Sequence, residues 1–140
     1  MRNLQINTGI KEFAINDDES KVLKINTADI QIAQRMKKSE KELNQIAEEC
    51  LKIDENMSVD DSIDLLDKYD KKVKTTLDYI FNTNVSEVVF GNMNCLSICD
   101  GKPVFQNFLE AIMPEIETDI QKETKKSEAN IKKYTSQVRK

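Results

Sequence analysis

Two cysteines that lie four residues apart are the side chains in this sequence best suited to chemistry. Cys95 and Cys99 fall in the stretch VSEVVFGNMNCLSICDGKPVFQNFLEAI, residues 85–112, which also holds two of the three glycines and three of the five phenylalanines. A tetrahedral zinc site needs four ligands such as Cys or His, but the chain has no His and only one further cysteine, Cys50. The CxxxC spacing also differs from the CxxC of redox motifs. We therefore expect these cysteines to be small buried hydrophobic residues.

Other motifs for catalysis or ligand binding are incomplete. The acidic segment DENMSVDDSIDL has oxygen ligands at the first positions of a calcium loop, but Val59 stands where that loop needs Gly and Leu65 where it needs Glu. FGNMN lacks the second glycine and the GK[ST] of a phosphate-binding loop. The absence of His removes the commonest general base. The sequence predicts a protein that is not an enzyme, with no catalytic residues, no metal and no cofactor.

The first 26 residues alternate apolar and polar side chains, as β-strands do. LQINT and EFAIN carry this alternation with Gly9 as a turn between them, and KVLKIN follows after the acidic loop DDES. We expect two or three short antiparallel strands here. A sheet of this size is marginal by itself, so it must pack against a helix.

From Thr27 onward the apolar residues recur at helical spacing. One stripe, in which only Ser39 is polar, predicts a long helix capped by Thr27 or Asp29. SVDD at residues 58–61 is a capping box that predicts the start of a second helix. The two helices should form an antiparallel pair joined by the short link DENM. The first stripe comprises residues 32, 36, 39, 43, 46, 50 and 53, and the second Val59, Ile63, Leu66, Tyr69 or Asp70, Val73, Leu77 and Ile80.

The segment after this pair must complete the core. NVSEVVF predicts a short helix capped by Asn84 and ended by Gly91, and MNCLSIC predicts another helical turn or two. DGKP is a turn signal that places Pro103 in the first turn of a last helix. Pro114 lies inside that helix and should kink or break it near Ala111.

These patterns predict one mainly α domain over residues 1–121. It comprises a small antiparallel β-hairpin or sheet at 1–26 and a helical bundle at 27–121, with a long helix hairpin and an extended C-terminal helix. Residues 122–140 carry seven Lys or Arg against two Glu within a chain of net charge −4. They predict a basic tail that is helical or partly disordered. The tail lacks interleaved aromatic residues and a base-reading motif, so we expect no nucleic-acid partner.

No segment indicates a membrane or an export route. The start MRNLQINTGIKEF has no apolar region of the signal-peptide type, and no apolar run approaches the ~20 residues of a membrane span. Three cysteines without a secretion signal fit reduced thiols. We expect an intracellular protein with no membrane partner.

The chain resembles the tail assembly chaperones of long-tailed bacteriophages and prophages of Gram-positive bacteria. The first part of the resemblance is the strand pair followed by KINTADIQIAQRMKKSEKEL, with its capping turn and long charged helix. The second is VSEVVFGNMNCLSICDGKPVFQNFLEAI, in which a helix ends at F-G, Asn and Cys follow, and an aromatic-rich helix leads into a charged end. Relatives often have Pro in the capping turn where this chain has Thr27-Ala28, and Pro114 is a further departure.

The resemblance implies a binding function in virion morphogenesis. Such chaperones coat the helical tape measure protein in the host bacterial cytoplasm, keep it soluble and help tail tube subunits assemble around it. It implies the tape measure protein as partner, with the tail tube protein as a further one, and a homo-oligomer. Our candidate contact residues lie at the junction and on the tail, and the first four have packing in the core as their alternative. They are Phe105, Phe108, Leu109, Ile112, Ile131, Tyr134 and Val138.

Two hypotheses from other classes stay open. A small inhibitor of phage or mobile-element origin would bind a host factor through the acidic helical surface, and a stable 1:1 complex would favour it. An enzyme or metal protein would use Cys95 and Cys99, and would need bound metal or thiols of lowered pKa.

Overall fold

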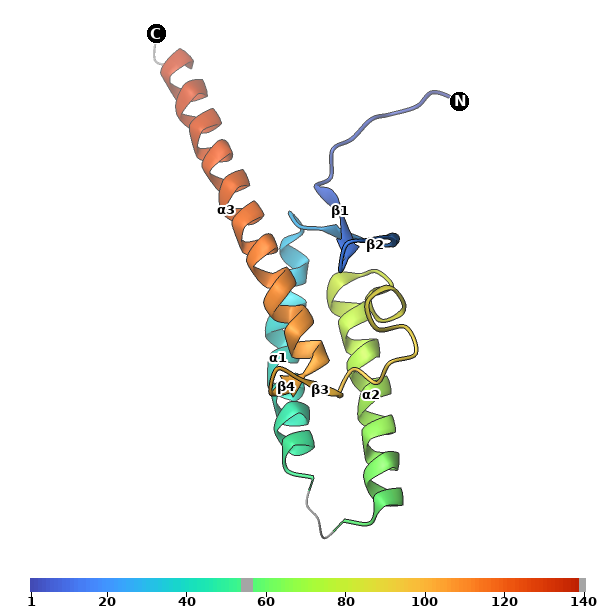
Figure 1. Cartoon of the computed structure of the whole chain (residues 1–140). Helices are drawn as coiled ribbons and strands as arrows, with labels where there is room; N and C mark the ends of the chain where they lie inside the picture. The colour runs from blue at the N-terminus through green and yellow to red at the C-terminus, as the bar shows by residue number, and fades with distance from the viewer. Residues whose placement is uncertain (54–56, 139–140) are drawn as a thin grey trace.

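In the computed structural model, the chain forms a β-hairpin, a helix pair, a compact corner and a long last helix (Figure 1). The structure describes residues 1–53 and 57–138, with side chains up to residue 131. The predicted mainly α fold, with its N-terminal antiparallel hairpin and extended C-terminal helix, is confirmed. The elements are β1 (Ile10–Ile15), β2 (Asp18–Asn26), α1 (Ile30–Leu51), α2 (Val59–Phe81), the π-helix η1 (Ser86–Phe90), β3 (Ile98–Cys99), β4 (Lys102–Pro103) and α3 (Val104–Val138).

The hairpin turns at Asn16 and Asp17, whose φ angles are 52° and 63°. Two consecutive positive φ angles are typical of the turns that match the twist of a two-stranded hairpin. β1 and β2 pair antiparallel, with Phe13 opposite Leu23. Leu23 is fully buried, so one face of the hairpin packs on the helices.

The segment LQINT forms no strand, and the prediction of a third strand there is wrong. Residues 1–8, which we call the arm, are exposed and extend away from the hairpin in Figure 1. Gly9 joins the arm to β1 with a φ of +91°. A Cβ at Gly9 would lie 2.6 Å from the Cβ of Ala28, so glycine is required by both conformation and space.

Both long helices begin where the caps were predicted. The Asp29 side chain accepts from the N–H of Gln31 at 2.9 Å, and Ser58 accepts from the N–H of Asp61 at 3.1 Å. α2 ends at Asn82, which has the left-handed conformation common at helix ends. The predicted link DENM lies at residues 54–57, of which 54–56 are outside the described residues.

The corner between α2 and α3 differs from its prediction. η1 is a π-helix, and Asn84 does not cap it; the residue before it, Val85, makes no side-chain cap. MNCLSIC consists of turns followed by β3, so the prediction of one or two helical turns there is wrong. β3 and β4 form a short antiparallel hairpin around Asp100 and Gly101, whose φ angles are 57° and 79°. Pro103 ends β4 directly before α3.

α3 runs without a break through Pro114, so the predicted break near Ala111 is wrong. Proline at this position removes the backbone hydrogen bond to the carbonyl of Glu110. Glu110 and Pro114 are both exposed, so water can bind that carbonyl. Burial ends after Ile120, and residues 121–131 are exposed although the helix continues.

One core joins all these elements. Its fully buried side chains include Ile25 of β2, Ile32 of α1 and Leu77 of α2, and α3 adds Phe105 and Ile116. α3 lies beside only part of the helix pair and then extends past the hairpin. The C-terminal end of α1 and the N-terminal end of α2 extend in the opposite direction (Figure 1). The bundle is therefore staggered, with one helix uncovered at one end and two helices uncovered at the other.

Candidate functional site

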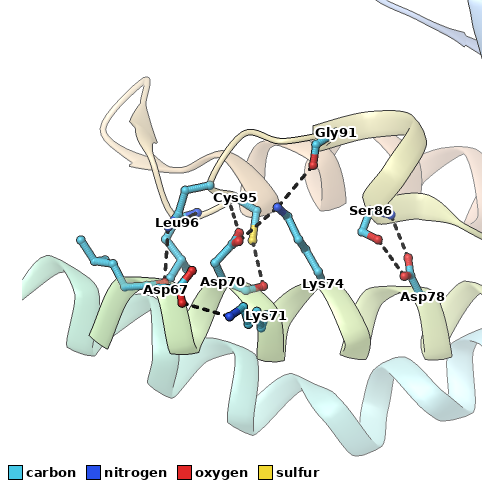
Figure 2. Close-up of polar contacts among 11 residues, drawn as sticks. Asp67, Asp70, Lys71, Lys74, Asp78, Ser86, Gly91, Cys95 and Leu96 are labelled. Atoms are coloured by element: carbon cyan, nitrogen blue, oxygen red, sulfur yellow. Dashed lines mark hydrogen bonds and ion pairs between the residues drawn. The ribbon is translucent and has the colours of Figure 1, made fainter. Parts of the chain in front are cut away.

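Cys95, the best chemical candidate in the sequence, lies against Asp70 of α2 (Figure 2). The N–H of Cys95 donates to Oδ1 of Asp70 at 2.8 Å, and its thiol donates to the Asp70 backbone carbonyl at 3.8 Å. Lys74 Nζ lies 3.1 Å from Oδ2 of the same carboxylate. Asp70 and Cys95 are both buried.

The same face of α2 binds the rest of the corner one turn further along. Lys74 Nζ also donates to the carbonyl of Gly91 at 3.5 Å. Asp78 accepts from the N–H and the hydroxyl of Ser86 at 2.8 Å and 2.7 Å (Figure 2). Residues four apart share a helix face, so Asp70, Lys74 and Asp78 form one polar row that fixes the corner to α2. We call this row the clamp.

The clamp does not prepare a reactive thiol. Burial and the neighbouring Asp70 raise the pKa of Cys95, so its thiol stays protonated near neutral pH. Burial also raises the pKa of Cys50. Within the part of the chain that the structure describes, no group of three Cys, Asp or Glu side chains could hold a metal ion. The cysteine corner is thus a helix junction held by hydrogen bonds.

Three of the four candidate contact residues at this junction are core residues. Phe105, Phe108 and Ile112 are buried, and Leu109 is half-buried. The Phe108 ring makes edge contacts with Phe81 and Phe90, at centroid distances of 5.6 Å and 6.2 Å. Their burial favours packing in the core over contact with a partner, and these were the two roles that the sequence left open.

The candidate contact residues of the tail lie on the uncovered part of α3. Ile131 is 62% exposed. Tyr134 and Val138 are also in α3, but their side chains are outside the described residues. The three tail residues are therefore in the same helix as the junction residues, but they lie near its C-terminal end rather than at the junction.

A groove runs between β1 and the first half of α3, and we call it the β1–α3 groove. It has a volume of about 380 Å³, and its apolar lining includes Phe13, Ile15, Phe108 and Ile112. Two of the predicted contact residues thus contribute to a surface hollow while remaining largely covered. Ala111, which is exposed, and Glu115 lie at the same groove.

A second apolar surface lies at the uncovered ends of α1 and α2, and we call it the hairpin-tip surface. Leu51, Met57, Val59 and Ile63 are between 38% and 74% exposed. Above Ile63 on the same helix face, Leu66 lines a hollow of about 390 Å³ together with Cys50, Ile53, Leu96 and Ile98. The predicted stripes contain several of these residues, but no sequence pattern indicated that α3 would leave them uncovered.

A scan against protein-family models, a search of curated proteins and a search of solved structures found no match for this chain. Across the described residues, no helix has both the length and the apolar character that crossing a membrane requires.

Proposed function

We propose that this chain is a tail assembly chaperone of a long-tailed phage or prophage, and that it binds and solubilises the tape measure protein without catalysis. We infer the tape measure protein as the partner from the resemblance of the sequence to that family. The observation that carries the proposal is the hairpin-tip surface, where two antiparallel helices expose apolar side chains that none of the described residues of α3 covers.

Two helices with a shared open seam can bind one more amphipathic helix in the groove between them. Val59, Ile63 and Leu66 are spaced by four and three residues, so they form one row along α2. A partner helix laid along this row would also contact Ile53 and Ile98 from the other side of the hollow. A tape measure protein is a long helical chain, and it offers such segments repeatedly.

The charges beside the surface define the partner further. Asp60 and Asp61 lie in the first turn of α2, directly beside Val59. An apolar stripe flanked by Lys or Arg is therefore the complementary helix face. A contact confined to this surface would allow release when tail tube subunits replace the chaperone, because small interfaces are typical of transient complexes.

The proposal is tested by charging the surface. The double variant Val59→Asp, Ile63→Asp should bind a purified tape measure fragment at least about tenfold more weakly than the wild-type chain, because two aliphatic contacts are lost. Ile30→Asp is the matched control, since Ile30 is 62% exposed in the first turn of α1, at the opposite end of the hairpin. Equal binding by the double variant, measured by calorimetry, would contradict the proposal.

A further inference from the structure

The arm and the β1–α3 groove have complementary chemistry within one chain. The arm carries Leu4 and Ile6, which are 80% and 72% exposed, on alternate positions. Alternate side chains of an extended segment point to the same side. The arm therefore presents an apolar side that the described residues of its own chain leave exposed.

The groove lies at an open strand edge. Four consecutive residues, Phe13 to Asn16, line it, whereas β2 contributes only Leu23 to its lining. Because neighbouring residues of a strand point to opposite faces, contact with Phe13, Ala14 and Ile15 of β1 places the groove at the edge of this strand rather than on one face. The sheet has two strands, so this edge of β1 lacks a strand partner.

We propose that the arm of a second copy of this chain lies in the β1–α3 groove as an added strand. Its backbone pairs with the edge of β1, and Leu4 and Ile6 enter the hollow beside Phe108 and Ile112. A volume of about 380 Å³ accommodates two aliphatic side chains of this kind.

Charge favours the arm as the occupant of the groove, and geometry favours the arm of a second copy over the chain's own. Arg2 on the arm matches Glu115 at the groove. Gly9 is fixed at the far end of β1, since its backbone packs against Ala28. With this packing and a φ of +91°, the arm leaves in a direction away from its own sheet (Figure 1).

This contact is independent of the tape measure proposal, because it uses a different surface from the hairpin tip. The arm precedes β1, whereas the described residues of the hairpin tip belong to α1, α2 and the positions beside them. Failure of one binding experiment therefore leaves the other unaffected.

The test is sedimentation equilibrium of the full chain and two variants. The wild-type chain should show a concentration-dependent mass of at least twice that of one chain. Leu4→Asp with Ile6→Asp should raise the dissociation constant at least about tenfold. The control is Asn3→Asp with Gln5→Asp, which adds the same charge on the other side of the arm and should leave the mass unchanged.

A variant of the β1–α3 groove tests whether the groove is the binding site of the arm. Ala111→Arg places a long side chain in the groove from an exposed position and should give a monomer, whereas Thr118→Arg, exposed on the same helix, should not. Mixing the arm variant with Ala111→Arg restores one intact arm and one intact groove, so a 1:1 dimer should form. A wild-type chain that stays monomeric up to about 1 mM, or a mixture that stays monomeric, would overturn the proposal.

Discussion

Asp70 is the side chain on which the corner most depends. Its carboxylate accepts from the buried N–H of Cys95 and pairs with Lys74, while Lys74 in turn reaches Gly91. These contacts join α2 to a segment 25 residues further along the chain. The corner then places Pro103 and Phe105, from which α3 starts into the core.

Asp70→Ala should destabilise the fold by about 1–3 kcal/mol, because it leaves a buried N–H without an acceptor. Asp70→Asn keeps an oxygen that accepts from the Cys95 N–H but removes the negative charge that pairs with Lys74. The stability lost in Asp70→Asn should therefore be smaller than in Asp70→Ala. Urea unfolding followed by circular dichroism measures both. A loss below about 0.5 kcal/mol for Asp70→Ala would show that the clamp does not hold the corner.

Asp119 makes the corresponding contact at the other end of the core. Lys11 Nζ of β1 lies 2.6 Å from its Oδ2, and the Asp119 side chain is 10% exposed. The hydrogen bonds from Lys11 and from the Thr27 hydroxyl lower the pKa of Asp119 below its ordinary value of 3.8. The contact ties the hairpin to α3 just before that helix leaves the bundle.

This lowered pKa predicts a pH dependence of stability. The Asp119 contribution is fully present above about pH 4, the unfolded-state value, and is lost as the pH falls through the lower folded-state pKa. Asp119→Asn should cost about 1 kcal/mol near pH 7, and its difference from the wild type should shrink below pH 4. A difference that stays constant from pH 7 to pH 2 in thermal unfolding would contradict this assignment.

At the scale of elements, the helix pair was predictable and the corner was not. The stripe from Ile32 to Ile46 repeats over many turns, and its buried side chains confirm it. η1 and β3 are only a few residues long, so their form is set by contacts such as Asp70 to Cys95 rather than by local sequence. The hairpin-tip surface was missed for a similar reason, because the exposure of Val59 and Ile63 depends on where α3 lies.

α3 offers a direct test of how an element tolerates an internal proline. Pro114 is exposed, so Pro114→Ala restores a helix hydrogen bond without creating a contact or a cavity. We expect a gain of about 1–3 kcal/mol in stability and unchanged helical content. Thr118→Ala, one turn later on the exposed side, is the control and should change stability by less than about 0.5 kcal/mol. A destabilised Pro114→Ala variant would mean that the proline sets a bend the core requires.

At the scale of the whole molecule, the staggered bundle separates three surfaces. The hairpin tip, the β1–α3 groove and the uncovered part of α3 comprise different sets of residues. A coating protein needs one surface for the coated chain and another for its neighbours, and both must be small enough to release. Residues 122–138 lie in α3 and contain five Lys against two Glu, within a chain whose net charge is −4.

The most direct test of the proposed function is co-expression of this chain with the tape measure protein encoded by the same phage or prophage. The soluble fraction is then analysed by size exclusion with light scattering. We predict a high-mass complex that contains many copies of this chain for each tape measure protein. A tape measure protein that stays insoluble while this chain elutes alone would contradict the proposal, and a stable 1:1 complex with a host protein would favour the inhibitor hypothesis instead.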